Sequence, residues 1–478
     1  MSGVSAIGQS RFSALRARQR AEALLDSGTF RPLPDACSDA PLLAGTGSIG
    51  GAPVLVALTD GRVRGGTIGV RESGVLARIA ESAQRGDVEG QRPLALILGF
   101  DTGGVRVEEG PIALAAASAV GVALARLSLS GVHLAAVISG PRGCFGAPAV
   151  MAALPERIII TADAQWGLTG PKLLGPAREE EGLAATSPLT RVTSGDAHVL
   201  VPDDIAAVRA QVRGFVCEII ASDPPAAVPF EDRLALSAAT AESVRSRLRG
   251  AADRPPQAAV EPRRRDLLSY SLRGMWTPSG PIRREGLVHA AFGTLRDRDG
   301  LGFIVGPERA GSSGVGIEET AVVTDMVRLA AARSGGEPAS ILTFLFCQGH
   351  AVDFVQERLG LQRCLAECLR AMVAARLRGH PIVTILGGGT YGAAYLALAA
   401  PSHRILALRG TSVAPMSPQV LRAFQALRGQ KVRQEAGAQL AELIPDIRMV
   451  DNIVRLPRVL AEELTTLLAT VRPEQRAA

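Results

Sequence analysis

The sequence predicts an α/β protein built from two tandem copies of one supersecondary unit. Three observations support this. Apolar strands alternate with glycine turns and small-residue helices, aromatic residues make up only 4% of the 478 residues, and the same order of motifs occurs twice. With so few aromatic side chains the cores must consist of Ala, Val, Leu and Ile, which suits close packing of helices on parallel sheets.

The first glycine turn follows an apolar strand predicted at 134–138. Gly140, Pro141, Gly143 and Gly146 interrupt the apolar run, and a helix of small residues begins directly after them. Such a turn leaves backbone N–H groups at a helix N-terminus, where they attract an anion or a developing oxyanion. The same pattern also arises from packing alone, so both roles stay open at this point.

The other elements of the first half build a βαβ crossover around this turn, which makes the two joined strands parallel. Asp60-Gly61 is a strong hairpin signal, and we expect it to join two short strands. The expected elements are an Arg-rich helix at 10–27, hairpin strands at 47–60 and 61–66, a helix at 73–84, a strand at 94–100, a glycine loop at 101–110, a helix at 112–129, a strand at 157–161 and a helix at 205–222.

The second half repeats the order of the first. Glu109 corresponds to Glu357, Gly140 to Gly388 and Arg157 to Arg404, each at an offset of about 248 residues. We therefore expect a first domain at 1–250, a Pro- and Arg-rich linker at 251–280 and a second domain at 281–478. The repeated elements are a strand at 341–346, a loop at 347–357, a helix at 360–377, a strand at 382–386 and a glycine turn at 387–395.

Composition narrows the classes of partner. The net charge is +6, but basic residues are not interleaved with aromatic ones, so nucleic acid is not expected and an anionic cofactor or acidic protein partner fits better. The six cysteines form no C-x-x-C pair and so no zinc ribbon. No signal-like segment and no apolar run of about 20 residues occurs, so we expect a cytoplasmic protein outside the membrane.

Two equivalent turns that face each other would suit a reaction through an enolate. Backbone N–H groups of one turn would stabilise the enolate oxygen of a thioester, and the other turn could hold a carboxylate. In other enzymes, removal of one backbone or side-chain donor to an oxyanion costs about 3–4 kcal/mol of transition-state stabilisation. This chemistry needs no nucleophile. Which turn takes the carbonyl and which the carboxylate stays open.

Several motifs resemble the carboxyltransferase branch of the crotonase superfamily. Residues 101–110, DTGGVRVEEG, resemble its D-S-G-G-A-R-x-Q-E-G motif, and RGGTIG at 64–69 is similar to its M-G-G-S-M-G. Residues 140–146 and 167–171 most resemble the β subunit of biotin-independent malonate decarboxylase, and 379–381 with 391–395 resemble the γ subunit. The resemblance covers about residues 40–215 and 285–455. It implies two tandem crotonase-like domains of the ββα spiral type, forming a pseudo-dimer.

Two segments depart from this pattern. Cys347-Gln-Gly-His350 stands where a Pro-Gly-Gln variant is expected, and residues 391–395 are closer to a biotin-dependent acyl-CoA carboxyltransferase. Two alternatives to decarboxylation therefore stay open. One is a biotin-dependent acyl-CoA carboxyltransferase, and the other is a non-catalytic scaffold that binds acyl carrier protein or CoA.

The resemblance also implies partners. An acyl carrier subunit bearing a phosphoribosyl-dephospho-CoA group would deliver a malonyl thioester, which loses CO₂ to become an acetyl thioester. An α subunit would exchange acetate for malonate on the carrier. The chain itself would hold no cofactor, use no biotin and bind no metal, and we expect it to form a homo-oligomer.

The candidate site residues follow from the turns and the resemblance. His350 follows Gly349 in the second loop and is the candidate proton donor to the enolate. For every candidate a structural role is the alternative: packing for the turns, an ion pair with Glu108 or Glu109 for Arg106, and a solvated loop position for His350. The candidate oxyanion groups are the backbone N–H groups of Gly143, Cys144, Phe145 and Gly146 in the first turn and of Gly392, Ala393 and Ala394 in the second; the candidate acyl or cofactor pocket comprises Gly65, Gly66, Gly103, Gly104 and Arg106.

Overall fold

The structure is a computed structural model. It describes the chain apart from residues 1–10, 34–39, 87–92, 175–177, 223–229, 252–275, 296–297, 307–313, 333–337, 348, 429–443, 445–446, 452–454 and 472–478. Most of the predicted linker at 251–280 therefore lies outside the described residues, as does Gln348 of the second loop.

The first half forms a seven-stranded sheet whose strands follow one another in chain order. The β2–β3 hairpin is antiparallel, and every later neighbour from β3 to β7 is parallel, as the crossover pattern predicts. The strands are β1 (Arg31–Pro32), β2 (Leu42–Ile49), β3 (Ala52–Thr59), β4 (Ala95–Phe100), β5 (His133–Ile138), β6 (Arg157–Thr161) and β7 (Val199–Val201).

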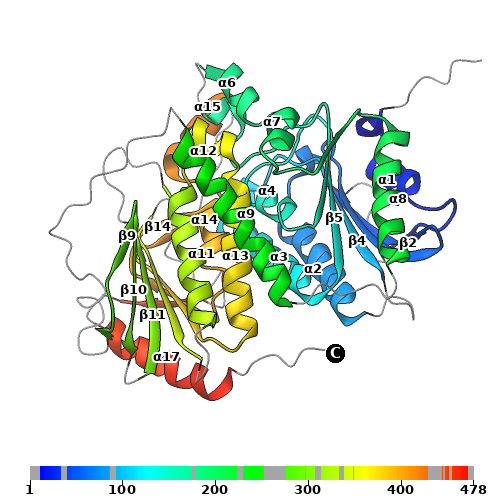
Figure 1. Ribbon diagram of the computed structural model, residues 1–478. Helices are drawn as coiled ribbons and strands as arrows, with labels where there is room; N and C mark the ends of the chain where they lie inside the picture. Colours follow the sequence, from blue (N-terminus) through cyan, green and yellow to red (C-terminus); the bar gives the residue numbers. More distant parts are fainter. Residues whose placement is uncertain are drawn as a thin grey trace, which may run out of the picture.

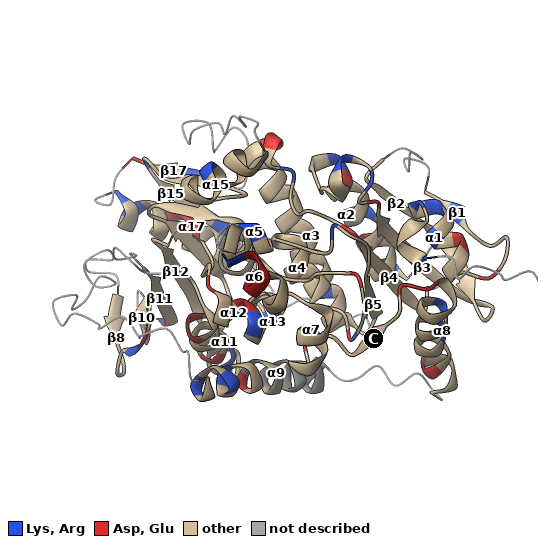
Figure 2. Ribbon diagram, turned by 90° about the horizontal axis from the view of Figure 1, so that it is seen from above, with Lys and Arg blue, Asp and Glu red and all other residues tan. Residues whose placement is uncertain are grey.

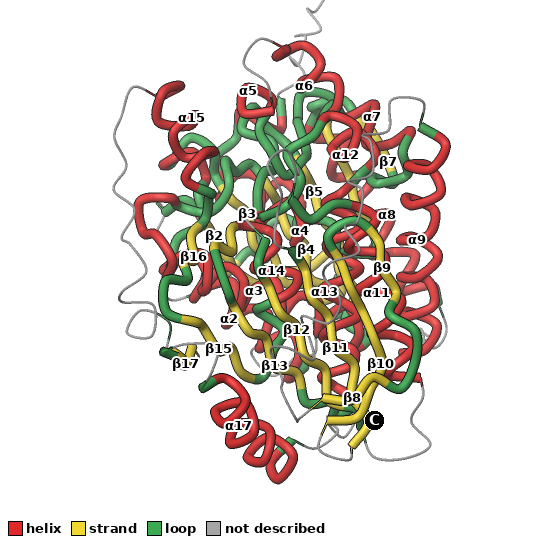
Figure 3. Tube along the Cα trace, turned by 90° about the vertical axis from the view of Figure 1, so that its left-hand side faces the viewer, coloured by secondary structure: helices red, strands yellow, loops and turns green. Residues whose placement is uncertain are grey.

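The second half repeats this topology. Its hairpin is again antiparallel and its later neighbours are again parallel, and Figure 3 shows these strands side by side. The strands, in sheet order, are β17 (Ile447–Val450), β15 (Arg404–Leu408), β13 (Ile382–Leu386), β12 (Ser340–Leu345), β11 (Arg298–Val305), β10 (Val288–Leu295) and β8 (Trp276–Pro278), with β9 (Arg283–Glu285) also on β10 and a separate pair of β14 (Gly389–Tyr391) and β16 (Ser412–Ala414).

The main helices lie between the two sheets (Figure 1). One continuous apolar cluster, drawn from both halves, fills this central layer, and smaller clusters lie under the helices on the outer face of each sheet. The central helices are α2 (Val70–Arg85), α3 (Gly110–Ser130), α4 (Ala147–Ala152), α9 (Phe230–Gly250), α11 (Ile317–Ala332), α13 (Leu361–Leu377) and α14 (Gly392–Leu398); the outer ones are α1 (Ala17–Leu24) and α8 (Ile205–Ala221) on the first sheet and α17 (Leu456–Thr470) on the second.

The two halves exchange contacts symmetrically. Helix α3 of the first half packs on α13 and α14, and α13 in turn packs on α3 and α4. A Cβ at Gly121 of α3 would lie 2.5 Å from the side chain of Leu396, so a glycine lets the backbone of α3 approach α14. The halves therefore form a pseudo-dimer of two units with the same topology, with α9 lying against α11 and α13 of the second unit.

The predicted hairpin turn at Asp60-Gly61 is wrong. The turn lies at Gly50-Gly51, where both residues have positive φ (61° and 80°), as a type I′ hairpin turn requires. The expected strand at 61–66 is instead a loop with a short 3₁₀ helix, η2 (Arg64–Gly66). Asp60 bonds the N–H and side chain of Arg62 and the Ala17 N–H, so its carboxylate fixes α1 and the loop rather than a turn.

The predicted helix at 10–27 is shorter than expected. A 3₁₀ turn, η1 (Phe12–Ala14), precedes α1, because Arg16 adopts an extended conformation between them. Among the described residues, the segment Val107–Ser130, which contains α3, is long and apolar enough to cross a membrane, but 56% of its most apolar window is buried. It packs on α2 and α13 as a core helix.

Candidate active site

The loops that follow the parallel strands lie together at the edge of each sheet. In the first half β4 runs into the 101–110 loop and β5 into the first turn, and carboxyl ends of parallel strands meet at one edge. Gly104 has a φ of 114°, and a Cβ there would lie 3.3 Å from the Phe145 carbonyl oxygen. Glycine therefore allows loop and turn to touch.

Three of the four predicted donors of the first turn are used inside the protein. Phe145 is the exception, since its N–H makes no backbone hydrogen bond of normal geometry in the part of the chain that the structure describes, and the parallel bridge of Thr102 with Cys144 directs it only weakly toward the Thr102 carbonyl. Phe145 is half-buried and is the donor of this turn that fits an oxyanion. The used N–H groups donate from Gly143 to the Gly140 carbonyl (3.1 Å), from Cys144 to the Gln165 carbonyl (2.8 Å) and from Gly146 to the Leu168 carbonyl (3.0 Å).

The Cys144 side chain is not suited to act as a nucleophile. It is fully buried, and burial raises the pKa of its thiol well above the ordinary value. The thiol therefore stays protonated at neutral pH, whereas attack needs the thiolate. Cys144 fills space beneath the turn.

The second half places His350 where the first half has Val105. In the first half the Ile68 N–H donates to the Gly104 carbonyl, and Ile68 forms a parallel bridge with Val105. In the second half the Val315 N–H donates to the Gly349 carbonyl (2.9 Å), and Val315 forms a parallel bridge with His350. The repeat therefore puts a titratable ring on one side of the pseudo-dimer only.

The second turn lies beside this ring. Gly392 has a φ of 52°, and a Cβ there would lie 3.9 Å from His350 Nδ1. A Cβ at Gly349 would lie 3.6 Å from the Tyr391 carbonyl oxygen, which repeats the contact of Gly104 with Phe145. By this correspondence Gly392 matches Gly146, and Ala393 and Ala394 lie buried in the first turn of α14.

His350 reaches across the pseudo-dimer to a threonine of the first half. Its Nε2 lies 3.2 Å from Thr169 Oγ1. Glu357, in α12 (Phe354–Leu359), accepts the Thr169 N–H at 2.7 Å and the Leu168 N–H at 3.0 Å, and its carboxyl also interacts with the Thr169 hydroxyl. Thr169 thus connects the carboxyl of Glu357 with the imidazole of His350.

Burial changes the protonation of both titratable groups. Desolvation raises the pKa of the fully buried Glu357 to about 7, although Arg191 and the two backbone N–H groups oppose this. Desolvation also lowers the pKa of His350 to about 4, so its ring is neutral at pH 7. The pair therefore stores a proton on the carboxyl rather than on the imidazole.

A buried arginine of the first half forms a hydrogen bond to the backbone of α12. Arg191, in α7 (Pro188–Thr193), pairs with Asp196 at 2.9 Å and donates to the Glu357 carbonyl oxygen at 2.6 Å. Gln362 of the second half donates to Asp196 at 3.3 Å. Figure 2 shows α12 beside α6 (Glu179–Ala185) of the first half, and the two helices are in contact.

The predicted pocket residues lie on the same side of the first half but are largely engaged internally. The Gly103 N–H donates to the Gly65 carbonyl at 2.9 Å, and a Cβ at Gly66 would lie 2.0 Å from the Asp101 carbonyl oxygen. Gly103 itself is exposed. These glycines bring the two loops together, and their ligand role stays a prediction.

Arg106 is also engaged inside the first half. The guanidinium is almost buried and pairs with Glu72 at 3.0 Å and Glu109 at 2.7 Å, while Thr67 accepts its other N–H groups. The Glu109 carboxylate accepts the Val70 N–H, whereas in the second half Gln356, not Glu357, takes this place on Ile317. The pairing of Glu109 with Glu357 is thus wrong by one residue, and this shift leaves Glu357 free to face Thr169.

Sequence reasoning did not select Thr169 or Glu357 as site residues. Thr169 lies in the Gly167–Pro171 segment that carries part of the resemblance, and Glu357 entered only as a repeat marker. The available signal was the position of Glu357, the fourth residue of a short helix that begins after the capping Asp353.

Two family models match the chain. Residues 13–235 match the carboxyl transferase domain, and residues 310–474 match the family described as malonate decarboxylase gamma subunit. Together they span most of the chain, one in each half.

Individual relatives are similar to one half or to both. The malonyl-S-ACP:biotin-protein carboxyltransferase of Malonomonas rubra is 28% identical over 231 residues, 43% of this chain and 72% of that protein. The acetyl-coenzyme A carboxylase carboxyl transferase subunits beta/alpha of Saccharopolyspora erythraea are 26% identical over 438 residues, 88% of this chain and 72% of that protein. A solved chain of the Pseudomonas malonate decarboxylase MdcD-MdcE hetero-dimer is 33% identical, with 44% of this chain and 88% of that chain covered and a TM-score of 0.39.

Proposed function

We propose a function that starts from the family of this chain. The chain belongs to the malonate decarboxylase family of carboxyltransferases, as a β-like half fused to a γ-like half. The proposed reaction is decarboxylation of a malonyl thioester, carried on an acyl carrier protein, to an acetyl thioester and CO₂. We assign the β-like part to residues 1–250, the linker to 251–280 and the γ-like part to 281–478.

One observation carries this proposal: the chain Glu357–Thr169–His350 crosses the pseudo-dimer and ends beside the second turn. A decarboxylase must protonate a carbon after CO₂ has left, and a carboxyl with a pKa of about 7 is a suitable proton store at neutral pH. A site that only bound a thioester would have no need of such a store.

The proposed steps balance without a nucleophile. The C–C bond of the malonyl group breaks, CO₂ leaves, and the electron pair forms the enolate of the acetyl thioester. His350 Nδ1–H gives its proton to the enolate carbon while Nε2 takes one from the Thr169 hydroxyl. The hydroxyl in turn takes the proton of Glu357. The chain resets when Nδ1 takes a proton from solvent, Nε2–H returns its proton to the Thr169 oxygen, and the hydroxyl proton returns to the Glu357 carboxylate.

Backbone donors would hold the charge that develops in this reaction. Among the predicted groups, the Phe145 N–H is the candidate in the first turn, and the N–H groups of Ala393 and Ala394 at the start of α14 are the candidates in the second. The Gly392 N–H is taken up by the parallel pairing of Tyr391 with Ala414, as the N–H of its counterpart Gly146 is by the Leu168 carbonyl, so we leave Gly143, Cys144, Gly146 and Gly392 as groups that shape the turns.

The proposal includes partners that the chain does not contain. An acyl carrier subunit with a phosphoribosyl-dephospho-CoA arm would bring the substrate, and an α subunit would reload it with malonate. The chain would use no biotin, would work in the cytoplasm and would form a homo-oligomer.

The experiment that tests the proposal follows CO₂. The purified full chain is given malonyl-CoA labelled in the free carboxyl, in buffer treated with avidin to remove biotin. We expect labelled CO₂ and acetyl-CoA in equal amounts. Binding of malonyl-CoA without turnover, also when the carrier and α subunits are added, would favour the scaffold and overturn the decarboxylase.

A biotin-dependent carboxyltransferase is the second candidate, because the Malonomonas relative is named for transfer to a biotin protein. The same assay separates the two when a biotinylated carrier domain is added. Label on biotin, with no CO₂ released in its absence, would establish the transferase instead.

A further inference from the structure

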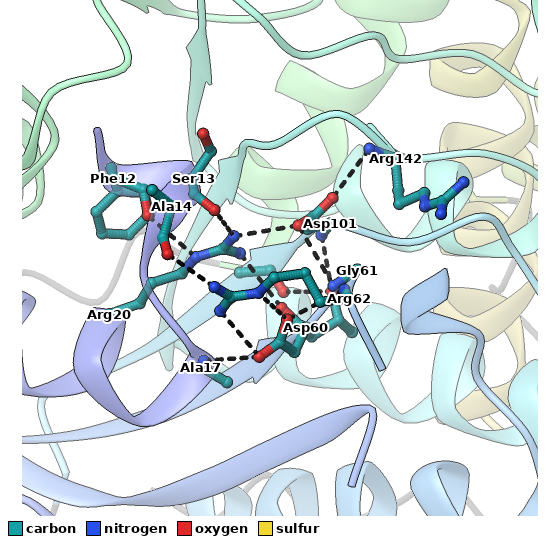
Figure 4. A network of polar contacts seen from close by, with 12 residues as sticks. Phe12, Ser13, Ala14, Ala17, Arg20, Asp60, Gly61, Arg62, Asp101 and Arg142 are labelled. Carbon is teal, nitrogen blue, oxygen red and sulfur yellow. Dashed lines mark hydrogen bonds and ion pairs between the residues drawn. The ribbon is translucent and has the colours of Figure 1, made fainter. Parts of the chain in front are cut away.

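The N-terminal segment 11–24 is bound to the first half at several points (Figure 4). Ser13 donates its N–H and hydroxyl to Asp203, and Ala17 donates its N–H to Asp60. Arg62 donates to the Ala14 carbonyl oxygen at 2.7 Å. The segment is thus part of the folded core and not a loose extension.

Arg20 of α1 lies at the centre of these contacts. Arg20 as a whole is 2% exposed, and its guanidinium donates to the carbonyl oxygens of Phe12 (3.2 Å) and Ser13 (2.8 Å). The guanidinium also donates to Asp101 Oδ2 at 3.1 Å, and its Cζ lies 5.6 Å from the centroid of the Phe12 ring. Arg20 therefore joins the N-terminal segment to the first residue of the 101–110 loop.

Asp101 passes this contact on to the first turn. Its Oδ1 accepts the Arg142 N–H at 3.1 Å, and its Oδ2 accepts the Gly61 N–H at 3.3 Å (Figure 4). A Cβ at Gly61 or at Gly140 would lie 2.5 Å from this carboxylate, so both loops close around it. Burial raises the pKa of Asp101, and Arg20 opposes that rise. Without Arg20 the carboxyl would become easier to protonate.

We propose that the N-terminal segment is a positioning element of the active site, in which Arg20 acts through the Asp101 carboxylate to hold the first turn. Arg142, which Asp101 binds, precedes Phe145 by three residues in that turn. A shift of the turn would move the Phe145 N–H from the place where an oxyanion forms. The inference rests on the proposed role of Phe145 in decarboxylation.

The test compares Arg20→Lys, Asp101→Asn, the double variant and a matched control in the full chain. Arg11→Gln is the control, because Arg11 pairs with Asp203 and Asp163 and anchors the same segment without touching Asp101. All variants are measured well below their melting temperatures. The two readouts are kcat for CO₂ release and amide hydrogen exchange at residues 140–146.

We expect Arg20→Lys to lower kcat at least tenfold and to speed exchange at the Arg142 and Gly143 amides, with KM changed less than threefold. The double variant should be no slower than the slower single variant, since both act through one contact. Arg11→Gln should change neither readout.

Two results would overturn the inference: unchanged exchange and kcat in Arg20→Lys despite a lower melting temperature, or an equal loss in Arg11→Gln. A wild-type chain that releases no CO₂ would refute the proposed function alone, because the exchange measurement still tests whether Arg20 holds the turn.

Discussion

Glu357 is the residue whose protonation most affects both stability and chemistry. Its folded pKa of about 7 lies above the ordinary 4.5, so between these values the folded state holds a proton that the unfolded state has released. Glu357 should therefore contribute a decline in stability as the pH rises from about 4.5 to 7, whereas the buried histidines contribute a rise over part of the same range. We expect Glu357→Gln to remove the contribution of Glu357. Between pH 4.5 and 7 the free energy of unfolding of the variant should then change by on the order of 2–3 kcal/mol relative to that of the wild type.

Urea denaturation at pH 5, 6, 7 and 8 measures this effect. The amide of the variant pairs less well with the two backbone N–H groups, which adds a constant offset at every pH. The comparison therefore uses the slope. Parallel stability curves for wild type and variant would show that Glu357 is ionised throughout.

His350 should be needed for turnover, and His403 provides its matched control. Burial lowers the pKa of both histidines to about 4, and His403 accepts the Ile382 N–H in the second sheet. Both folded groups stay neutral where the unfolded ones, with a pKa of 6.5, bind a proton, so each weakens the fold as the pH falls from 6.5 to 4. We expect His350→Gln to lower kcat by about 100-fold.

His403→Gln should remove an equal part of the loss of stability that occurs as the pH falls from 6.5 to 4, and its kcat should stay at the wild-type value. Steady-state CO₂ release at pH 7, together with melting temperatures at pH 5 and 7, checks both variants. Equal losses of kcat would mean that His350 acts through the fold alone.

The sequence could reveal the glycine turns and His350 but not how their groups are used. Composition and spacing mark Phe145 and Cys144 equally, and only the hydrogen-bond pattern separates the weakly held Phe145 N–H from the firmly bonded N–H of Cys144. The contact between Thr169 and Glu357 joins residues 188 positions apart. No local pattern encodes such a contact, because it depends on how the two halves pack.

At the scale of elements, glycine placement decides where the chain turns. Gly51 of the β2–β3 turn has a φ of 80° and open space around it, so Gly51→Ala should cost about 1–2 kcal/mol of stability from backbone strain and leave kcat unchanged. Gly61→Ala would collide with the Asp101 carboxylate and should lower both stability and kcat. Chemical denaturation and CO₂ release distinguish them, and equal kcat values would contradict this assignment.

The same pair of turns explains the misplaced hairpin. Asp-Gly is a strong turn signal, but the β2–β3 register places Ile49 opposite Ala52 and leaves only Gly50 and Gly51 between the strands. Strands such as 157–161 and 382–386 were predicted at their observed bounds, since a buried parallel strand is a continuous apolar run with clear ends.

At the scale of the molecule, duplication was visible in the sequence because the order of motifs repeats, whereas the packing of the halves was not. The central apolar cluster takes residues from both halves, so neither unit buries its own helices alone. The buried Arg191–Asp196 pair adds polar contacts across the same boundary. The whole chain should therefore unfold as one cooperative unit.

The two tryptophans of the chain allow a direct test, because Trp166 lies in the first half and Trp276 in the second, and both are buried. In Trp276→Phe the fluorescence reports the first half, and in Trp166→Phe it reports the second. For each variant we expect the fluorescence midpoint in urea to coincide with the midpoint from far-ultraviolet circular dichroism. Arg191→Ala removes the closer of two arginines that pair with the buried Asp196, with Arg247 remaining at 3.8 Å, and should lower stability by about 3–5 kcal/mol in both reporters alike. Separate midpoints for the two halves would instead mean that each half folds as a domain of its own.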